Sequence, residues 1–288
     1  PCLLRMTSTA GIPEPACSCL KSEGHIVLGT RGSDLALAQT QIVAEKLRAA
    51  HPRLNIEKRV IKTTGDKRLE LSLSGSLERG LFTKELEEAL LAGSIHAAVH
   101  SLKDLPTERP DGLVFGAILK RADPSDVLVS KRRGGLAGLP IEACVATSSP
   151  RRKVQILLLR EDLRIVEMRG NVPTRLRKLA ADPSLDGILL AKAGLDRLGR
   201  EVIPAGLHVA VVERILPAPG QGAIAVECRE SDLESIELLR AVHHEATAIC
   251  VAAERDFLRA QGGGCHVAIA AWATIEDGRL ILRTFPPS

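Results

Sequence analysis

The sequence repeats one pattern in which a short apolar run ends in a polar loop and an amphipathic segment follows. The mostly apolar runs 26–28, 95–99, 143–146 and 164–168 each lead into a loop that holds Ser, Thr, Arg or Asp. Short apolar runs predict buried strands, and apolar residues at helical spacing between them predict helices. Strands that alternate with helices are typical of parallel sheets, so we predict an α/β fold. Because the pattern starts again near residue 143, we predict two such domains.

The C-terminal part follows a different pattern. Residues 245–260 have helical periodicity, and the glycines at 262–264 end the predicted helix. Two stretches of alternating apolar and polar residues then flank Asp277-Gly278, a dipeptide typical of tight β-hairpin turns. We therefore predict a third, smaller α+β domain.

The basic residues are biased toward arginine, with 27 Arg and 12 Lys among the 39. A guanidinium group binds a carboxylate or phosphate through two hydrogen bonds, so the bias predicts an acidic ligand. The chain has four Phe, one Trp and no Tyr, whereas proteins that bind single-stranded nucleic acid stack bases on aromatic side chains. A small polyanion is therefore the favoured ligand.

Three loops combine Ser, Thr or Asn with Arg between a predicted strand and a predicted helix, at 30–33, 147–152 and 169–175. The N-terminus of a helix offers free N–H groups and a partial positive charge, so these loops predict anion sites. In the alternative interpretation, Ser33 and Ser149 only cap helices and the arginines cover the surface. The presence of three such loops favours a ligand with several carboxylates.

Asp104 follows Lys103 at the end of an apolar run, among basic residues. A carboxylate in such a place stays ionised, and it can stabilise positive charge or move protons. The alternative is a surface ion pair or a helix cap. For His100 we expect a packed histidine, and for His243 and His244 a capping position.

The seven cysteines form neither a disulfide framework nor a set with metal-ligand spacing, so we expect a reducing compartment and no metal site. Cys144, Cys228 and Cys250 lie in apolar runs and are predicted core residues. Cys265 instead follows three glycines, which allow close approach by a large partner. Its thiol is therefore a candidate nucleophile or attachment point.

Eight ordered motifs resemble the porphobilinogen deaminase family, also called hydroxymethylbilane synthases, over residues 26–285. They are Gly29-Thr30-Arg31-Gly32-Ser33, Leu81-Phe82-Thr83-Lys84-Glu85-Leu86, Val99-His100-Ser101-Leu102-Lys103-Asp104-Leu105-Pro106, Thr147-Ser148-Ser149-Pro150-Arg151-Arg152, Arg169-Gly170-Asn171 with Thr174-Arg175, Ala193-Gly194-Leu195-Asp196-Arg197-Leu198-Gly199, Pro219-Gly220-Gln221-Gly222-Ala223 and Gly263-Gly264-Cys265.

The resemblance implies a transferase of tetrapyrrole and haem biosynthesis. Such an enzyme joins four porphobilinogen molecules head to tail on a covalent dipyrromethane primer, releases ammonia at each step, and yields linear hydroxymethylbilane. By the same resemblance, Asp104 is the catalytic carboxylate and Cys265 holds the primer through a thioether. The implied contacts with cofactor and substrate are Arg31, Ser33, Phe82, Lys103, Thr147, Ser149, Arg151, Arg152, Arg169, Arg175 and Arg197.

The resemblance also implies two α/β domains like those of periplasmic binding proteins, around a cleft. We predict domain 1 at 25–120 and 220–240, domain 2 at 125–215 and domain 3 at 244–288. The family's third domain extends beyond Ser288, so we expect an incomplete third domain here. Gly75 stands where the family commonly has Lys, which puts one loop contact in doubt.

Two other interpretations stay open at this point. In the first, the chain is a catalytically impaired fragment. In the second, it is a non-catalytic anion-binding protein of the same two-domain architecture. We expect a cytoplasmic monomer that binds porphobilinogen and the growing pyrrole chain, but neither nucleic acid nor a membrane. Residues 1–24 are too poor in Arg to support an organellar import signal.

Overall fold

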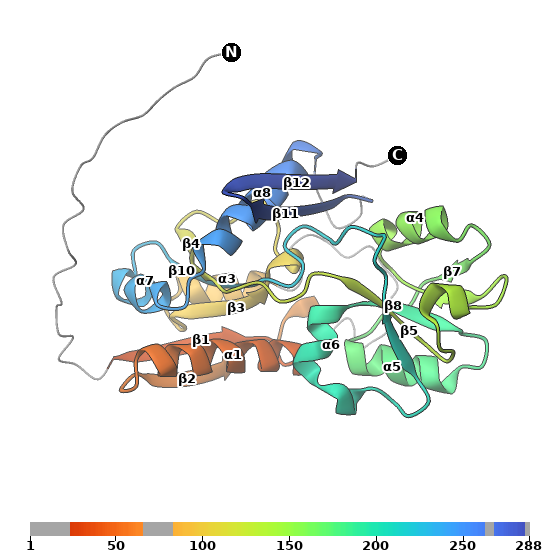
Figure 1. Ribbon diagram of the computed structural model, residues 1–288. Coiled ribbons are helices and arrows are strands. Elements are labelled where there is room, and N and C mark those ends of the chain that lie inside the picture. Colours follow the sequence, from red (N-terminus) through yellow and green to blue (C-terminus); the bar gives the residue numbers. More distant parts are fainter. Residues whose placement is uncertain (1–23, 66–82, 263–267, 286–288) are drawn as a thin grey trace, which may run out of the picture.

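The computed structural model describes residues 24–65, 83–262 and 268–285, and all structural statements below refer to these. Two α/β units lie side by side, and a helix with a hairpin lies along one side of them (Figure 1). The predicted fold class is confirmed: two α/β units and a small α+β unit. In the described part, no helix combines the length and the apolar character needed to cross a membrane.

The first unit is built on a five-stranded sheet with the order β2-β1-β3-β10-β4. Its apolar core includes Ile26 and Leu28 from β1, Val43 and Leu47 from α1, and Val226 from β10, each nearly or fully buried. This packing follows the helical spacing of apolar residues in α1. The strands are β1 (His25–Thr30), β2 (Asn55–Val60), β3 (Ala97–Ser101), β4 (Leu113–Ile118) and β10 (Ile224–Arg229), and the helices are α1 (Asp34–Ala50), α3 (Lys84–Leu91) and α7 (Leu233–Arg240).

The second unit is built on a five-stranded sheet with the order β7-β6-β8-β5-β9. Separate apolar clusters cover its two faces. Leu176 and Leu179 of α5 pack on one face, and Ile156 of α4 packs on the other. The strands are β5 (Asp126–Ser130), β6 (Cys144–Ala146), β7 (Arg164–Val166), β8 (Gly187–Ala191) and β9 (His208–Val211), and the helices are α4 (Pro150–Leu159), α5 (Val172–Ala181) and α6 (Lys192–Leu198).

Both sheets are mixed, so the prediction of parallel sheets is only partly right. β1 is parallel to β2 and β3, and β6 is parallel to β7 and β8. In contrast, β10 is antiparallel to β3 and β4, and β5 is antiparallel to β8 and β9. These two strands enter a sheet directly from the other unit, without the crossover helix that makes a strand parallel to its neighbour.

The third unit consists of α8 (Glu245–Ala260) and the antiparallel hairpin β11 (Ala270–Glu276) and β12 (Arg279–Phe285). Asp277 and Gly278 have φ of 50° and 73°, as the predicted hairpin turn requires. His244 caps α8 by accepting a hydrogen bond from Thr247 N, which agrees with the capping position expected from the sequence.

A buried carboxylate attaches α8 to the segments that connect the two α/β units. Glu254 is fully buried and pairs with the guanidinium of Arg121, at 2.5 Å between Nη1 and Oε1. The same carboxylate accepts hydrogen bonds from Gly220 N and Ala273 N, both at 2.7 Å. Since Arg121 follows β4 and Gly220 precedes β10, α8 contacts both connections between the units.

Candidate functional site

Asp104 ends a short 3-10 helix, η1 (Leu102–Asp104), that directly follows β3. Leu102 and Leu105 are buried in one apolar cluster with Val251 of α8. These side chains anchor the turn, while the Asp104 carboxylate is exposed. A cavity of about 60 Å³ lies beside it and is lined by Arg31, Ser33, Leu35, Ala36, Gln39, Thr83, Val99, His100, Ser101, Asp104 and Leu105.

The 30–33 loop and η1 meet because they follow neighbouring parallel strands, β1 and β3. Ser33 caps α1 by accepting a hydrogen bond from Ala36 N, so the capping role is present for this serine. Gln39 of α1 donates to Ser101 Oγ at 2.8 Å, which fixes α1 against the end of β3. Arg31 and Ser33 therefore line the same cavity as Asp104, as expected for loops at the carboxyl ends of adjacent strands.

The 147–152 loop begins α4. Ser149 caps this helix by accepting from Arg152 N at 3.4 Å, and its own N–H donates to Thr147 Oγ1 at 3.2 Å. Thr147 is buried and Ser149 is half-buried. Both hydroxyls thus accept backbone hydrogen bonds that stabilise the turn.

Arg151 and Arg152 are buried, and both pair with the carboxylate of Asp126. The alternative that these two arginines cover the surface is therefore wrong. Arg151 Nη1 donates to Asp126 Oδ2 at 2.6 Å, and Arg152 Nε donates to Oδ1 at 3.0 Å. Burial alone would raise the pKa of Asp126, but Arg152 and Arg151 hold that pKa well below its usual range. Gln221 adds a hydrogen bond to the same carboxylate at 2.9 Å. The sequence analysis missed Asp126 and Gln221, although a charged residue that opens an apolar strand is a detectable signal.

Lys103 of the first unit and Arg175 of the second both interact electrostatically with Asp104 and Arg152. Burial lowers the pKa of Lys103 to about 8; Asp104 opposes this shift and Arg152 adds to it. Burial and Arg152 also lower the pKa of Arg175, and Asp104 opposes that shift. Arg175 Nε donates to Gly170 O at 2.7 Å, which fixes its stem. Cationic groups from both units are thus within electrostatic reach of Asp104.

Of the remaining sequence-predicted residues, the structure describes Arg197 and Arg169. Arg197 donates to Gly222 O at 2.6 Å, and burial lowers its pKa to about 10. Arg169 is exposed. Phe82 and Cys265 lie outside the described residues, and so does Gly75, where the family commonly has Lys.

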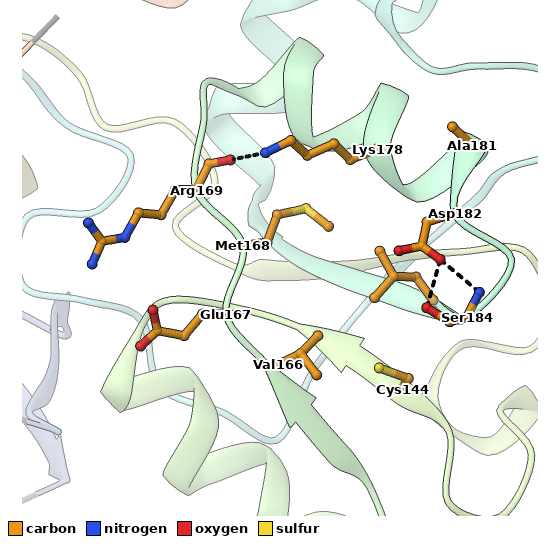
Figure 2. Close-up of a pocket in the computed structure, with 10 residues that line it drawn as sticks. Cys144, Val166, Glu167, Met168, Arg169, Lys178, Ala181, Asp182 and Ser184 are labelled. Carbon is orange, nitrogen blue, oxygen red and sulfur yellow. Dashed lines mark hydrogen bonds between the residues drawn. The ribbon is translucent and has the colours of Figure 1, made fainter. Parts of the chain in front are cut away.

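A larger cavity of about 540 Å³ lies beside β7 and α5. Of the candidate residues that the structure describes, only Arg169 lines it, and Figure 2 shows its guanidinium group extending away from the other lining side chains. Met168 and the Cys144 thiol contribute apolar lining, and Lys178 Nζ donates to Arg169 O at 3.2 Å. The larger cavity is therefore not where the candidate residues gather.

His100 contacts a buried glutamate that the sequence analysis also missed. Its Nε2 lies 3.5 Å from Glu227 Oε2, and both side chains are almost completely buried. This distance would suit an ion pair. However, burial, together with Arg31, lowers the pKa of His100 to about 4, and burial raises the pKa of Glu227 to about 7. Both groups are therefore neutral between about pH 4 and pH 7. In agreement, neither Glu227 oxygen has a hydrogen-bond donor within the described part of the chain.

We expect Glu227→Gln to stabilise the protein increasingly as the pH rises. Between the ordinary glutamate value of 4.5 and about 7, the unfolded carboxyl loses its proton while the folded one keeps it. The parent's free energy of unfolding therefore falls as the pH rises through this window, by up to about 3 kcal/mol, whereas glutamine does not titrate. Thermal unfolding at pH 5 and pH 8 measures the difference. The exposed Glu230→Gln is the control, and a Glu227→Gln effect that is the same at both pH values would contradict the assignment.

Two sequence families match most of the chain. Residues 26–237 match the family described as "Porphobilinogen deaminase, dipyromethane cofactor binding domain", and residues 248–285 match "Porphobilinogen deaminase, C-terminal domain". The chain is 51% identical over 262 residues to the porphobilinogen deaminase of Moorella thermoacetica, covering 90% of this chain and 82% of the relative. It is 48% identical over 259 residues to that of Syntrophomonas wolfei, covering 90% and 84%. Among solved structures, the BenM effector-binding domain with benzoate is similar at a TM-score of 0.44 and 19% identity, covering 76% of this chain and 91% of that one.

Proposed function

The chain belongs to the porphobilinogen deaminase family, and from that premise we propose which of its residues carry the reaction. The protein is a transferase of tetrapyrrole and haem biosynthesis. It is a hydroxymethylbilane synthase that joins porphobilinogen units with release of ammonia, and it uses a dipyrromethane cofactor.

The charges between the two α/β units fit this cofactor. Dipyrromethane carries an acetate and a propionate on each of its two rings, so it needs several cationic partners. Lys103 and Arg175 have lowered pKa values because burial and neighbouring cations disfavour their charged forms. Arg151 and Arg152 together bind the single carboxylate of Asp126, which leaves net positive charge. A ligand with several carboxylates would relieve this excess charge.

We propose that residues from both units hold the carboxylates of cofactor and substrate. Arg31 and Ser33 would act from the first unit, with Lys103 beside Asp104. From the second unit we propose Thr147, Ser149, Arg151, Arg152, Arg169, Arg175 and Arg197, and we retain Phe82 as a contact with the pyrrole site. We propose Cys265 as the thioether attachment point. When bound, the cofactor supplies the terminal pyrrole to which incoming units are joined.

We propose Asp104 as the catalytic carboxylate. As ammonia leaves porphobilinogen, positive charge develops on the pyrrole ring of the substrate. A carboxylate that is already in place when this charge develops stabilises it without a cost of reorganisation. The observation that carries the proposal is the placement of Asp104. It is exposed at the end of β3, beside Lys103 and within electrostatic reach of Arg175.

The domain division and the setting of the protein are also proposals. We propose domain 1 at 25–120 and 220–240, domain 2 at 125–215 and domain 3 at 244–288. The connecting segments near 122–125 and 215–220 would act as hinges between the first two. We propose a cytoplasmic monomer whose partners are porphobilinogen and the growing pyrrole chain, without nucleic acid.

The intact mass of the purified protein and its product formation test this function together. We expect a mass increase equal to two pyrrole units and formation of hydroxymethylbilane from porphobilinogen. A non-catalytic anion-binding protein would show neither the adduct nor the product. An adduct without turnover would instead indicate an impaired fragment, so the two measurements distinguish the alternatives.

A further inference from the structure

Arg255 of α8 holds the backbone immediately after Asp104. Its Nη1 donates to Leu105 O at 3.2 Å and its Nη2 donates to Pro106 O at 2.5 Å. The side chain is only 7% exposed, so water competes little for these carbonyls. The Leu105 N–H in turn donates to Leu102 O, which closes the turn that carries the carboxylate.

The surroundings of Arg255 keep its guanidinium group in place. Its Cζ lies 5.6 Å from the centre of the Phe115 ring, while Arg109 lies over the same ring at 4.2 Å. Burial, with Arg109 and Arg259, lowers the pKa of Arg255 to about 10. The side chain therefore remains charged at neutral pH, and its two hydrogen bonds are charge-assisted.

The two carbonyl acceptors are suited to the planar guanidinium group of an arginine, which carries several N–H donors in fixed positions. Leu105 and Pro106 present consecutive carbonyl oxygens, and one guanidinium group reaches both through separate nitrogens. A lysine ammonium is a single charged point on a flexible stem and does not reproduce this geometry. The apolar contact of Leu102 and Leu105 with Val251 brings α8 close to the turn, but apolar contacts are not directional.

We propose that Arg255 is a positioning residue for Asp104: it fixes the turn by the two carbonyls that follow the carboxylate. This inference rests on the proposed role of Asp104. α8 ends at Ala260, five residues before Cys265 in the sequence. The helix that holds the Asp104 turn is thus the helix that precedes the proposed attachment cysteine. Arg255 thereby sets the position of the carboxylate relative to the third unit.

Arg255→Met and Arg255→Lys in the full chain test this role. Methionine keeps most of the apolar stem, and lysine keeps the charge. We expect Arg255→Met to lower kcat about 10- to 100-fold, with KM changed less than about threefold and the cofactor mass retained. Arg255→Lys should recover only part of kcat. Arg259→Met is the control, because Arg259 lies one turn further along the same helix and is exposed.

A double variant separates positioning from a general structural role. If Arg255 acts through Asp104, adding Arg255→Met to Asp104→Asn should lower kcat less than about threefold further. Losses that multiply would overturn the inference, as would unchanged kcat in Arg255→Met. If Arg255→Met does not fold, the same cycle is measured with Arg255→Lys. If Asp104→Asn alone keeps the parent rate, the proposed role of Asp104 fails first.

Discussion

Cys265→Ala should carry no covalent dipyrromethane and form no product, while its thermal unfolding stays close to that of the parent. A thioether forms at a thiol that is accessible and able to ionise. Among the described cysteines, Cys144, Cys228 and Cys250 are buried. Burial raises the pKa of all three, that of Cys228 to about 11. These thiols are therefore poor attachment points.

Intact mass, peptide mapping and product formation measured on one preparation test the Cys265 prediction. Mapping of the parent should place the adduct on Cys265 alone. Cys144→Ala is the matched control: it removes a buried thiol from an apolar cluster, so we expect a stability cost of about 1 kcal/mol or less and an unchanged adduct. An adduct on Cys228 or Cys250, or a Cys265→Ala protein that still turns over, would refute the assignment.

Local patterns in the sequence predicted most of the strands and helices around the site. β1 with α1, β6 with α4 and β7 with α5 each follow the apolar-run, loop and helix pattern. The pattern missed β2, whose side chains are mostly exposed, because an edge strand without a buried face has no apolar alternation. It also missed β10 and the antiparallel direction of β5, because both depend on how the chain passes between the units.

The meeting of the 30–33 loop with Asp104 was predictable because it follows from adjacent parallel strands. The partners of the buried ionisable groups were not. Asp126 lies about 25 residues before the arginines that it binds, and Glu227 pairs with a histidine from another strand. Such pairs form between elements that are distant in sequence, and no local spacing records them.

Asp104→Asn should still assemble and hold the dipyrromethane, at least in part, while its turnover falls by about 100-fold or more. The amide keeps the size and hydrogen-bonding capacity of the side chain but removes the charge. A loss of this size corresponds to about 3 kcal/mol of stabilisation made mainly in the transition state. Cofactor assembly depends less on Asp104, because the cationic groups proposed to hold the cofactor's carboxylates remain in the variant. Adduct mass and product formation should be measured on the same preparation.

The pH dependence of the residual activity makes the Asp104 prediction sharper. Burial lowers the pKa of Lys103 to about 8, and the Asp104 carboxylate opposes that shift. Asp104→Asn removes this opposition, so Lys103 should lose its proton, and with it its attraction for substrate carboxylates, at a lower pH than in the parent. KM should therefore rise with pH earlier in the variant. Asp111→Asn, at an exposed carboxylate in the following loop, should change neither turnover nor this profile. If Asp104→Asn turns over near the parent rate with its cofactor in place, the carboxylate is structural and the proposed mechanism is wrong.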